Sequence, residues 1–155
     1  MGVYLSTPST NIAIESGTGE TLSYIAGEMQ GWRKGMEDDH ITEVDFTVDG
    51  SEKKFSLFAV FDGHGGKEIA IFSKFYFVEE LAKNTSFLEG RYKEALEEVF
   101  LRIDTLLEDP KYEPELAFYR KIPNPSDLPA DAHLAKFRFT PLQDQVQILV
   151  NFDLL

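Results

Sequence analysis

Residues 30–40 read QGWRKGMEDDH, and residues 61–66 read FDGHGG. Each stretch places carboxylates beside glycines at the end of an apolar run that is typical of a strand. A carboxylate cluster is costly to assemble, because like charges raise one another's pKa and resist burial. A divalent cation removes that cost, and oxygen ligands suit magnesium, manganese or calcium better than zinc. The two stretches therefore predict part of an oxygen-ligand metal site, with Arg33 nearby for an anion.

The apolar runs around these stretches predict three strands. Residues 22–29 form the first, and residues 41–48 and 53–61 form two more, separated by a turn signal at Asp49-Gly50. The last two runs predict a hairpin whose open end carries the carboxylates. In residues 53–61 apolar side chains occupy both alternating sets of positions, so we expect both faces of that strand to be buried.

Two helices are predicted after the hairpin. Gly65-Gly66 opens the first, which continues to Ala82 and directs free N–H groups toward the carboxylates, an arrangement that suits an anion. Residues 89–107 form the second, with one apolar stripe that we expect to pack on a sheet. No chemistry is assigned to this second helix.

The chain has the length of about one domain. Its polar, Ser/Thr-rich residues 1–20 predict a flexible N-terminal arm, and residues 21–108 predict the body of the domain. In residues 109–155 repeated prolines predict a loop, followed by a divergent tail with a last strand at residues 145–152. There is no internal repeat.

The composition excludes several classes of protein. Asp and Glu number 27 against 15 Lys and Arg, a formal charge of −12, so nucleic-acid binding and docking on an anionic membrane are not expected. The absence of cysteine excludes disulfides, Cys-ligated zinc and thiolate nucleophiles. No apolar run has the length of a membrane-spanning helix and no signal peptide is evident, so we expect a cytoplasmic or nuclear location.

The motifs resemble those of a known family. The segments Gly31-Trp32-Arg33 and Met36-Glu37-Asp38, followed by residues 62–66 (DGHGG), look like the first two signature motifs of the PP2C-type (PPM family) metal-dependent protein phosphatases. The resemblance covers roughly residues 1–110. It implies an α+β fold, an αββα sandwich of antiparallel sheets flanked by helices, of which this chain holds the N-terminal part.

The resemblance implies a role for each matched residue. Glu37, Asp38 and Asp62, with the backbone carbonyl of Gly63, correspond to ligands of a centre that holds two Mg²⁺ or Mn²⁺ ions, and Asp62 to the ligand that bridges them. Arg33 corresponds to the phosphate-binding arginine, whose planar fork matches two phosphate oxygens.

Histidines and a third aspartate complete the candidate set. His64 corresponds to the general acid that protonates the leaving oxygen of serine or threonine. We expect His40 to orient the carboxylates and Asp39 to be a solvated or neighbouring group. Taken singly, the glycine-rich turn and the acidic run are also compatible with a plain turn and a solvated patch; their combination with Arg33 favours a site.

The implied activity is hydrolysis of phosphoserine and phosphothreonine in proteins by a metal-activated water. The later family motifs, which supply further aspartates, are not found, and Asp131, Asp144 and Asp153 lack the glycine-flanked context. We therefore expect a truncated form with little activity by itself. Two alternatives stay open: a non-catalytic PP2C-like binding or regulatory protein, and another two-metal hydrolase such as a nuclease, which the acidic charge disfavours.

The first residues carry one further pattern. Met1-Gly2 with Ser6 fits N-myristoylation at Gly2, and an unmodified start is the alternative. No Lys or Arg precedes Arg33, so a polybasic second signal is missing. A single acyl chain binds membranes only marginally, and we expect at most weak peripheral membrane association.

Overall fold

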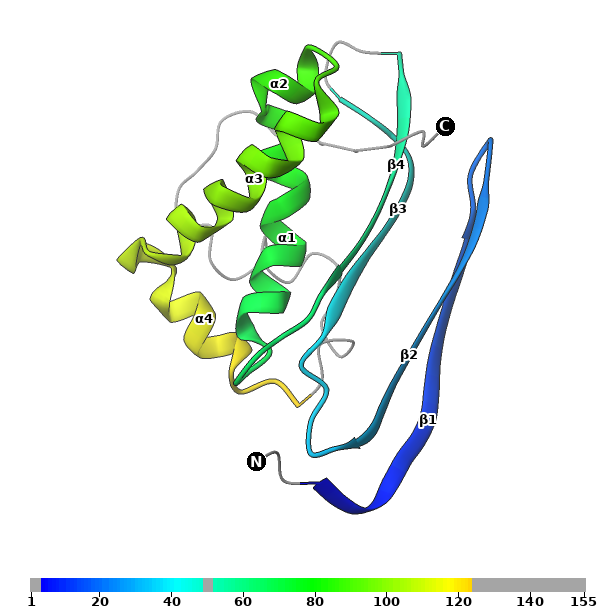
Figure 1. Ribbon diagram of the computed structural model, residues 1–155, viewed down its shortest axis with the longest axis vertical. Helices are drawn as coiled ribbons and strands as arrows, with labels where there is room; N and C mark the ends of the chain where they lie inside the picture. The colour runs from blue at the N-terminus through cyan, green and yellow to red at the C-terminus, as the bar shows by residue number, and fades with distance from the viewer. Residues whose placement is uncertain (1–3, 49–51, 124–155) are drawn as a thin grey trace.

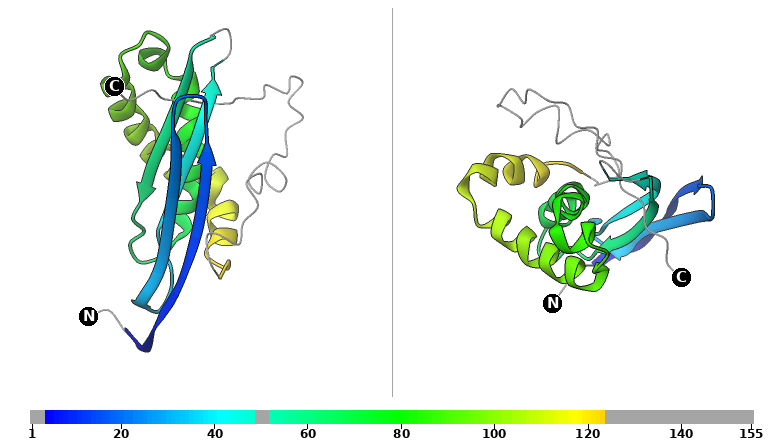
Figure 2. Two further views of the ribbon diagram at one scale, coloured as in Figure 1. Left: turned by 90° about the vertical axis from the view of Figure 1, so that its right-hand side faces the viewer. Right: turned by 90° about the horizontal axis from the view of Figure 1, so that it is seen from above.

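The computed structural model describes residues 4–48 and 52–123. These residues form three layers, with helices on one side, a central two-stranded sheet, and a second two-stranded sheet on the other side (Figure 1). The perpendicular views in Figure 2 show the same order of layers. Antiparallel sheets with helices make this an α+β fold, as the sequence predicts.

Both sheets are antiparallel hairpins. The strands are β1 (Tyr4–Thr18), β2 (Ser23–Arg33), β3 (Asp39–Thr47) and β4 (Lys54–Phe61). In the outer hairpin, Ile12 lies opposite Met29 and Thr18 opposite Ser23. The β3–β4 pairing confirms the predicted hairpin, because its register runs from Thr47 opposite Lys54 to Asp39 opposite Phe61.

The helices cover one face of the β3–β4 hairpin (Figure 1). They are α1 (Glu68–Lys83), α2 (Thr85–Leu88), α3 (Tyr92–Leu107), the 3₁₀ turn η1 (Pro110–Tyr112) and α4 (Glu113–Tyr119). The helix predicted over residues 89–107 begins later, at Tyr92. The short α2 precedes it, where the Asn84 side chain accepts a hydrogen bond from the Phe87 N–H and caps the turn.

The hydrophobic core lies between the helices and the central hairpin. From the strands it takes Ile41, Phe46, Phe55 and Leu57. From the helices it takes the fully buried faces of α1 and α3, and α4 adds Leu116 and Tyr119. The face of the β3–β4 hairpin next to α1 is apolar, and the helices that cover it are amphipathic. The interface between them therefore fixes the direction in which the strand ends point.

Three expectations from the sequence are wrong. The segment expected to be a flexible arm forms strand β1, paired with β2. The loop expected from Asp109 contains η1 and α4, because Pro110 and Pro114 occupy the first turns of helical segments, where a missing N–H costs nothing. The outer face of β4 is not buried: Val60 is 77% exposed and lines a cavity next to β2.

Several predicted features lie outside the described residues. They are Gly2, the turn at Asp49-Gly50, the strand at residues 145–152, and the aspartates Asp131, Asp144 and Asp153. Within the described part of the chain, no helix combines the length and apolar character needed to cross a membrane.

Candidate active site

The candidate site lies at the open end of the central hairpin. Asp39 begins β3, Phe61 ends β4, and these two residues are paired. Asp38 and Asp62 are the next residues outward, one before β3 and one after β4, so the strand register places them side by side. The hairpin thus brings together carboxylates that are 24 positions apart in the sequence.

The two carboxyl groups interact directly. Partial burial, together with the charge of Asp62 and a hydrogen bond between the two side chains, raises the pKa of Asp38. A hydrogen bond donated by the Gly63 N–H and the charge of Arg33 act in the opposite direction. A pair of like-charged groups held this close favours a bound proton or a bound cation.

The backbone around the carboxylates is closely packed at Gly63. A Cβ on Gly63 would collide with the carbonyl oxygen of Glu37 and lie 2.8 Å from the carbonyl oxygen of Gly66. Only glycine allows the loop after β4 to approach the segment before β3 so closely. The Glu37 backbone is therefore part of the site, whereas its carboxylate is not grouped with those of Asp38 and Asp62 in the described structure.

Arg33 ends β2, on the other hairpin. Gly31 adopts a φ of +65°, and the Gln30 side-chain amide donates a 2.8 Å hydrogen bond to the Arg33 carbonyl, so the chain turns before Gly35. The Arg33 guanidinium is exposed, and its charge acts on Asp38. The charge of Arg33 therefore reaches the acidic pair at the hairpin end.

His64 lies in the loop between β4 and α1, two residues after Asp62, and its side chain is exposed. Gly65 and Gly66 follow with φ values of +78° and +154°, which favour glycine, and α1 begins at Glu68. The exposure leaves the imidazole accessible to a ligand at the loop surface.

The solvated alternative for Asp39 is excluded, and the expectation for His40 is wrong. Asp39 is not solvated: it is 4% exposed and its Oδ1 lies 2.7 Å from Lys74 Nζ of α1. His40 does not orient the candidate carboxylates. Its side chain is on the face of β3 opposite to that of Asp39, where Nε2 lies 3.5 Å from Glu15 and Nδ1 lies 3.6 Å from Glu28.

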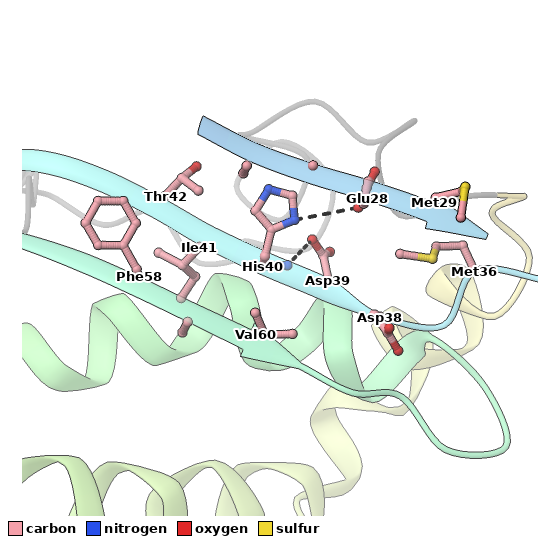
Figure 3. Close-up of a pocket in the computed structure, with 13 residues that line it drawn as sticks. Glu28, Met29, Met36, Asp38, Asp39, His40, Ile41, Thr42, Phe58 and Val60 are labelled. Carbon is pink, nitrogen blue, oxygen red and sulfur yellow. Dashed lines mark hydrogen bonds and ion pairs between the residues drawn. The ribbon is translucent and has the colours of Figure 1, made fainter. Parts of the chain in front are cut away.

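A cavity of about 560 Å³ separates the two hairpins above this histidine. Figure 3 shows His40 and Glu28 joined by an ion pair within its lining, with Asp38 toward the end where Met36 lies. Glu15 of β1 accepts a hydrogen bond from Thr42 of β3, which links the two hairpins. It also accepts one from Tyr24 of β2, within the outer hairpin. Against the effect of burial, these bonds and the His40 charge lower the pKa of Glu15. Sequence reasoning missed Glu15, Glu28 and Lys74, because none lies in a motif.

The donor atoms at the open end define what the site can hold. Within residues 4–48 and 52–123, no three His, Cys, Asp or Glu side chains are arranged to hold a metal ion. The Asp38–Asp62 pair nevertheless fits a hard divalent cation, since both donors are carboxylate oxygens and their mutual repulsion is relieved by positive charge. The described residues therefore supply a two-carboxylate half-site with an arginine beside it.

The fold and this half-site define an α+β protein of the class that gathers carboxylate side chains at strand ends as candidate metal ligands. The family model "Protein phosphatase 2C" matches residues 22–117. The chain belongs to the protein phosphatase 2C family. The match covers β2 through most of α4, and so includes the whole candidate site.

Curated relatives agree with this membership. A relative named "Probable protein phosphatase 2C 4" from Paramecium tetraurelia is 47% identical over 75% of this chain and 37% of its own length. "Protein phosphatase 2C 1" of the same organism is 46% identical over 77% of this chain and 38% of its own length. "Probable protein phosphatase 2C 21" from Arabidopsis thaliana is 36% identical over 76% of this chain and 32% of its own length. The chain thus spans well under half of these relatives.

Proposed function

We propose that this chain is the site-bearing N-terminal portion of a Mg²⁺- or Mn²⁺-dependent protein serine/threonine phosphatase. The observation that carries the proposal is the contact between Asp38 and Asp62, made where the paired ends of β3 and β4 meet. The family match and the relatives' names support phosphatase chemistry. The substrates in this proposal are phosphoserine and phosphothreonine in proteins.

In this proposal Asp38 and Asp62 hold the cation, with Glu37 and the Gly63 carbonyl as the further candidates that the family motif implies. A bound divalent ion of this kind lowers the pKa of a coordinated water and supplies the nucleophile. The Gly63 N–H acts on Asp38 in the direction that favours the charged carboxylate, which is the form that binds a cation. Water is the expected nucleophile because the chain contains no cysteine.

Arg33 and His64 act on the phosphate group. The exposed Arg33 guanidinium sits close enough for its charge to act on Asp38, so an anion bound there would lie beside the cation site. His64 is exposed in the adjoining loop, where its imidazole can reach a bound ligand and donate a proton to a leaving oxygen.

The proposal is tested first by metal binding. Calorimetric titration of the chain with MnCl₂ should show saturable binding that is lost in a double variant, Asp38→Asn with Asp62→Asn. Asp104, an acidic residue on α3 away from the hairpin end, offers a matched control: Asp104→Asn should leave the titration unchanged. A wild-type chain that binds no Mn²⁺ would overturn the metal-dependent part of the proposal.

Turnover separates the catalytic proposal from its alternative. A phosphothreonine peptide and a small aryl phosphate should be hydrolysed slowly in excess Mn²⁺, since two carboxylates leave most ligand positions of an ion to water. Binding of the phosphopeptide with no hydrolysis at any metal concentration would favour a non-catalytic binding or regulatory protein instead.

We also propose that the protein acts in the cytoplasm or nucleus, with N-myristoylation at Gly2 as an optional weak membrane signal. Mass spectrometry of the chain purified from a eukaryotic host would show the acyl group. An unmodified N-terminus in a host that myristoylates a control protein would contradict the modification.

A further inference from the structure

Arg120, at the end of α4, is joined to the first turn of α1. Its Nε lies 2.8 Å from Oε1 of Glu68, and its Nη1 lies 3.0 Å from Oε1 of Glu113. Beside it, Lys67 Nζ donates a 3.0 Å hydrogen bond to the Pro123 carbonyl. Two successive residues at the start of α1 are therefore tied to the segment around α4, although about fifty positions separate them.

Glu68 connects this ion pair to the glycine loop. One carboxylate oxygen accepts from Arg120, and the other, Oε2, lies against Gly66, where an added Cβ would displace the Glu68 carboxylate. Gly66 in turn packs its carbonyl against Gly63, which packs against the Glu37 carbonyl. The chain of contacts thus runs from Arg120 through Glu68 to the loop that carries Asp62 and His64.

A small cavity of about 120 Å³ marks the same junction. Arg120 and Glu68 line it together with Glu37, Gly66 and Met36. The space beside the loop would allow the loop to shift if the Glu68 carboxylate were released. The ion pair therefore restrains a part of the structure that packing alone leaves incompletely filled.

The far side of Arg120 is anchored by the interior. The Glu115 carboxylate of α4 is buried and accepts hydrogen bonds from Tyr76 on α1 and Tyr119 on α4. Leu116 and Tyr119 belong to the hydrophobic core. Because α4 is held in this way, Arg120 presents its guanidinium from a fixed position rather than from a free end.

We propose that Arg120 is a positioning residue for the phosphatase site: through Glu68 it holds the Asp62–Gly66 loop against the Glu37–Asp38 segment. The effect of this role on metal binding rests on the proposed function. Its structural part concerns the loop in the metal-free chain and can be tested separately.

The chain contains a matched control for this ion pair. Arg102 of α3 pairs through Nε with Glu80 of α1 at 2.7 Å, and the two pairs have nearly the same exposure, 48% and 15% for Arg120 and Glu68 against 50% and 16% for Arg102 and Glu80. Both pairs join α1 to another helix. Only the Arg120 pair adjoins the glycine loop, so Arg120→Met and Arg102→Met should differ at the site. Arg120→Met also removes the exposed pair with Glu113, whose effect on global stability urea denaturation of both variants measures.

The test is amide hydrogen exchange of residues 62–67 in the metal-free chain, followed by MnCl₂ titration. Arg120→Met should speed exchange in this loop by about two- to fivefold, the effect expected from a partly exposed ion pair worth up to about 1 kcal/mol. The same variant should raise the Kd for Mn²⁺ by a similar factor. Arg102→Met should change neither quantity, and Arg120→Lys should recover part of both.

Each outcome decides between the possibilities. Equal loop exchange in the two methionine variants would overturn the positioning role, as would unchanged Mn²⁺ affinity in Arg120→Met when the wild-type chain binds the ion. If the wild-type chain binds no Mn²⁺ but the exchange contrast is found, Arg120 positions the loop and the proposed metal-dependent function is the part that fails.

Discussion

Gly63 lies so close to the carbonyl oxygen of Glu37 that no side chain can be accommodated between them. This contact joins the segment before β3 to the loop after β4, and it therefore sets how closely Asp38 and Asp62 approach each other. The geometry of the acidic pair depends on a backbone contact rather than on the acidic side chains alone.

A methyl group at this position should separate the two segments. Gly63→Ala is expected to destabilise the chain by about 1–3 kcal/mol, the usual cost of forcing extra volume into a closely packed place. It should also weaken Mn²⁺ binding by more than the loss of global stability explains. Gly35→Ala is the control, because no atom lies within 4 Å of the Cβ that it would add. Urea denaturation measures the stability and calorimetry measures the Mn²⁺ affinity. Equal changes in the two variants would contradict the role assigned to the contact between Gly63 and Glu37.

Asp62 and His64 should differ in their effect on the metal. Asp62→Asn removes a carboxylate that contacts Asp38, whereas His64→Ala removes an exposed side chain from the adjoining loop. We expect the Kd for Mn²⁺ to rise at least about tenfold in Asp62→Asn, roughly 1.4 kcal/mol, and to change little in His64→Ala. Titration calorimetry checks this, and equal losses would argue against the assignment of Asp62 as a ligand.

Lysine in place of Arg33 should keep the positive charge of the site but should not bind phosphate as well. Arg33→Lys keeps the positive charge and loses the planar pair of donors, so inorganic phosphate should bind about tenfold more weakly in the presence of Mn²⁺. Trp32 is the single tryptophan, is exposed and adjoins Arg33, so its fluorescence can report the titration. Lys34→Met is the control for charge. A Lys34→Met variant that loses as much affinity would show that general charge, not the fork of Arg33, holds the anion.

The buried carboxylate of α4 should give the stability a pH dependence. Burial raises the pKa of Glu115, although hydrogen bonds from Tyr119 and Tyr76 oppose the shift. A raised pKa in the folded state means that the contribution of Glu115 is fully present below its ordinary pKa and is lost as pH rises through the folded value.

The matching experiment compares the wild-type chain with Glu115→Gln. The free energy of unfolding of the wild-type chain relative to this variant should be most favourable below pH 4 and should decline as the pH rises toward 7. Denaturation at a series of pH values measures it. A difference that grows as the pH rises would mean that the hydrogen bonds from the tyrosines outweigh burial.

The local sequence determined much of the candidate site. Two apolar runs with a turn signal between them fix a hairpin, and the residues just outside its open end must then be neighbours. Asp38 and Asp62 are brought together for this reason, and the helix that follows Gly66 was predicted from the spacing of its apolar residues. The family motifs lie on this same local unit, so their positions could be read before any packing was known.

The tertiary structure alone decided what surrounds that unit. Strand β1 is exposed along most of its length, so its residues carry no burial pattern from which pairing with β2 could be inferred. His40 faces Glu15 and Glu28 because the outer hairpin packs on that side of β3, which no motif specifies. Arg120 reaches Glu68 only because α4 folds back on α1. Contacts between elements far apart in the sequence depend on how whole faces pack, and a linear pattern of residues does not encode that choice locally.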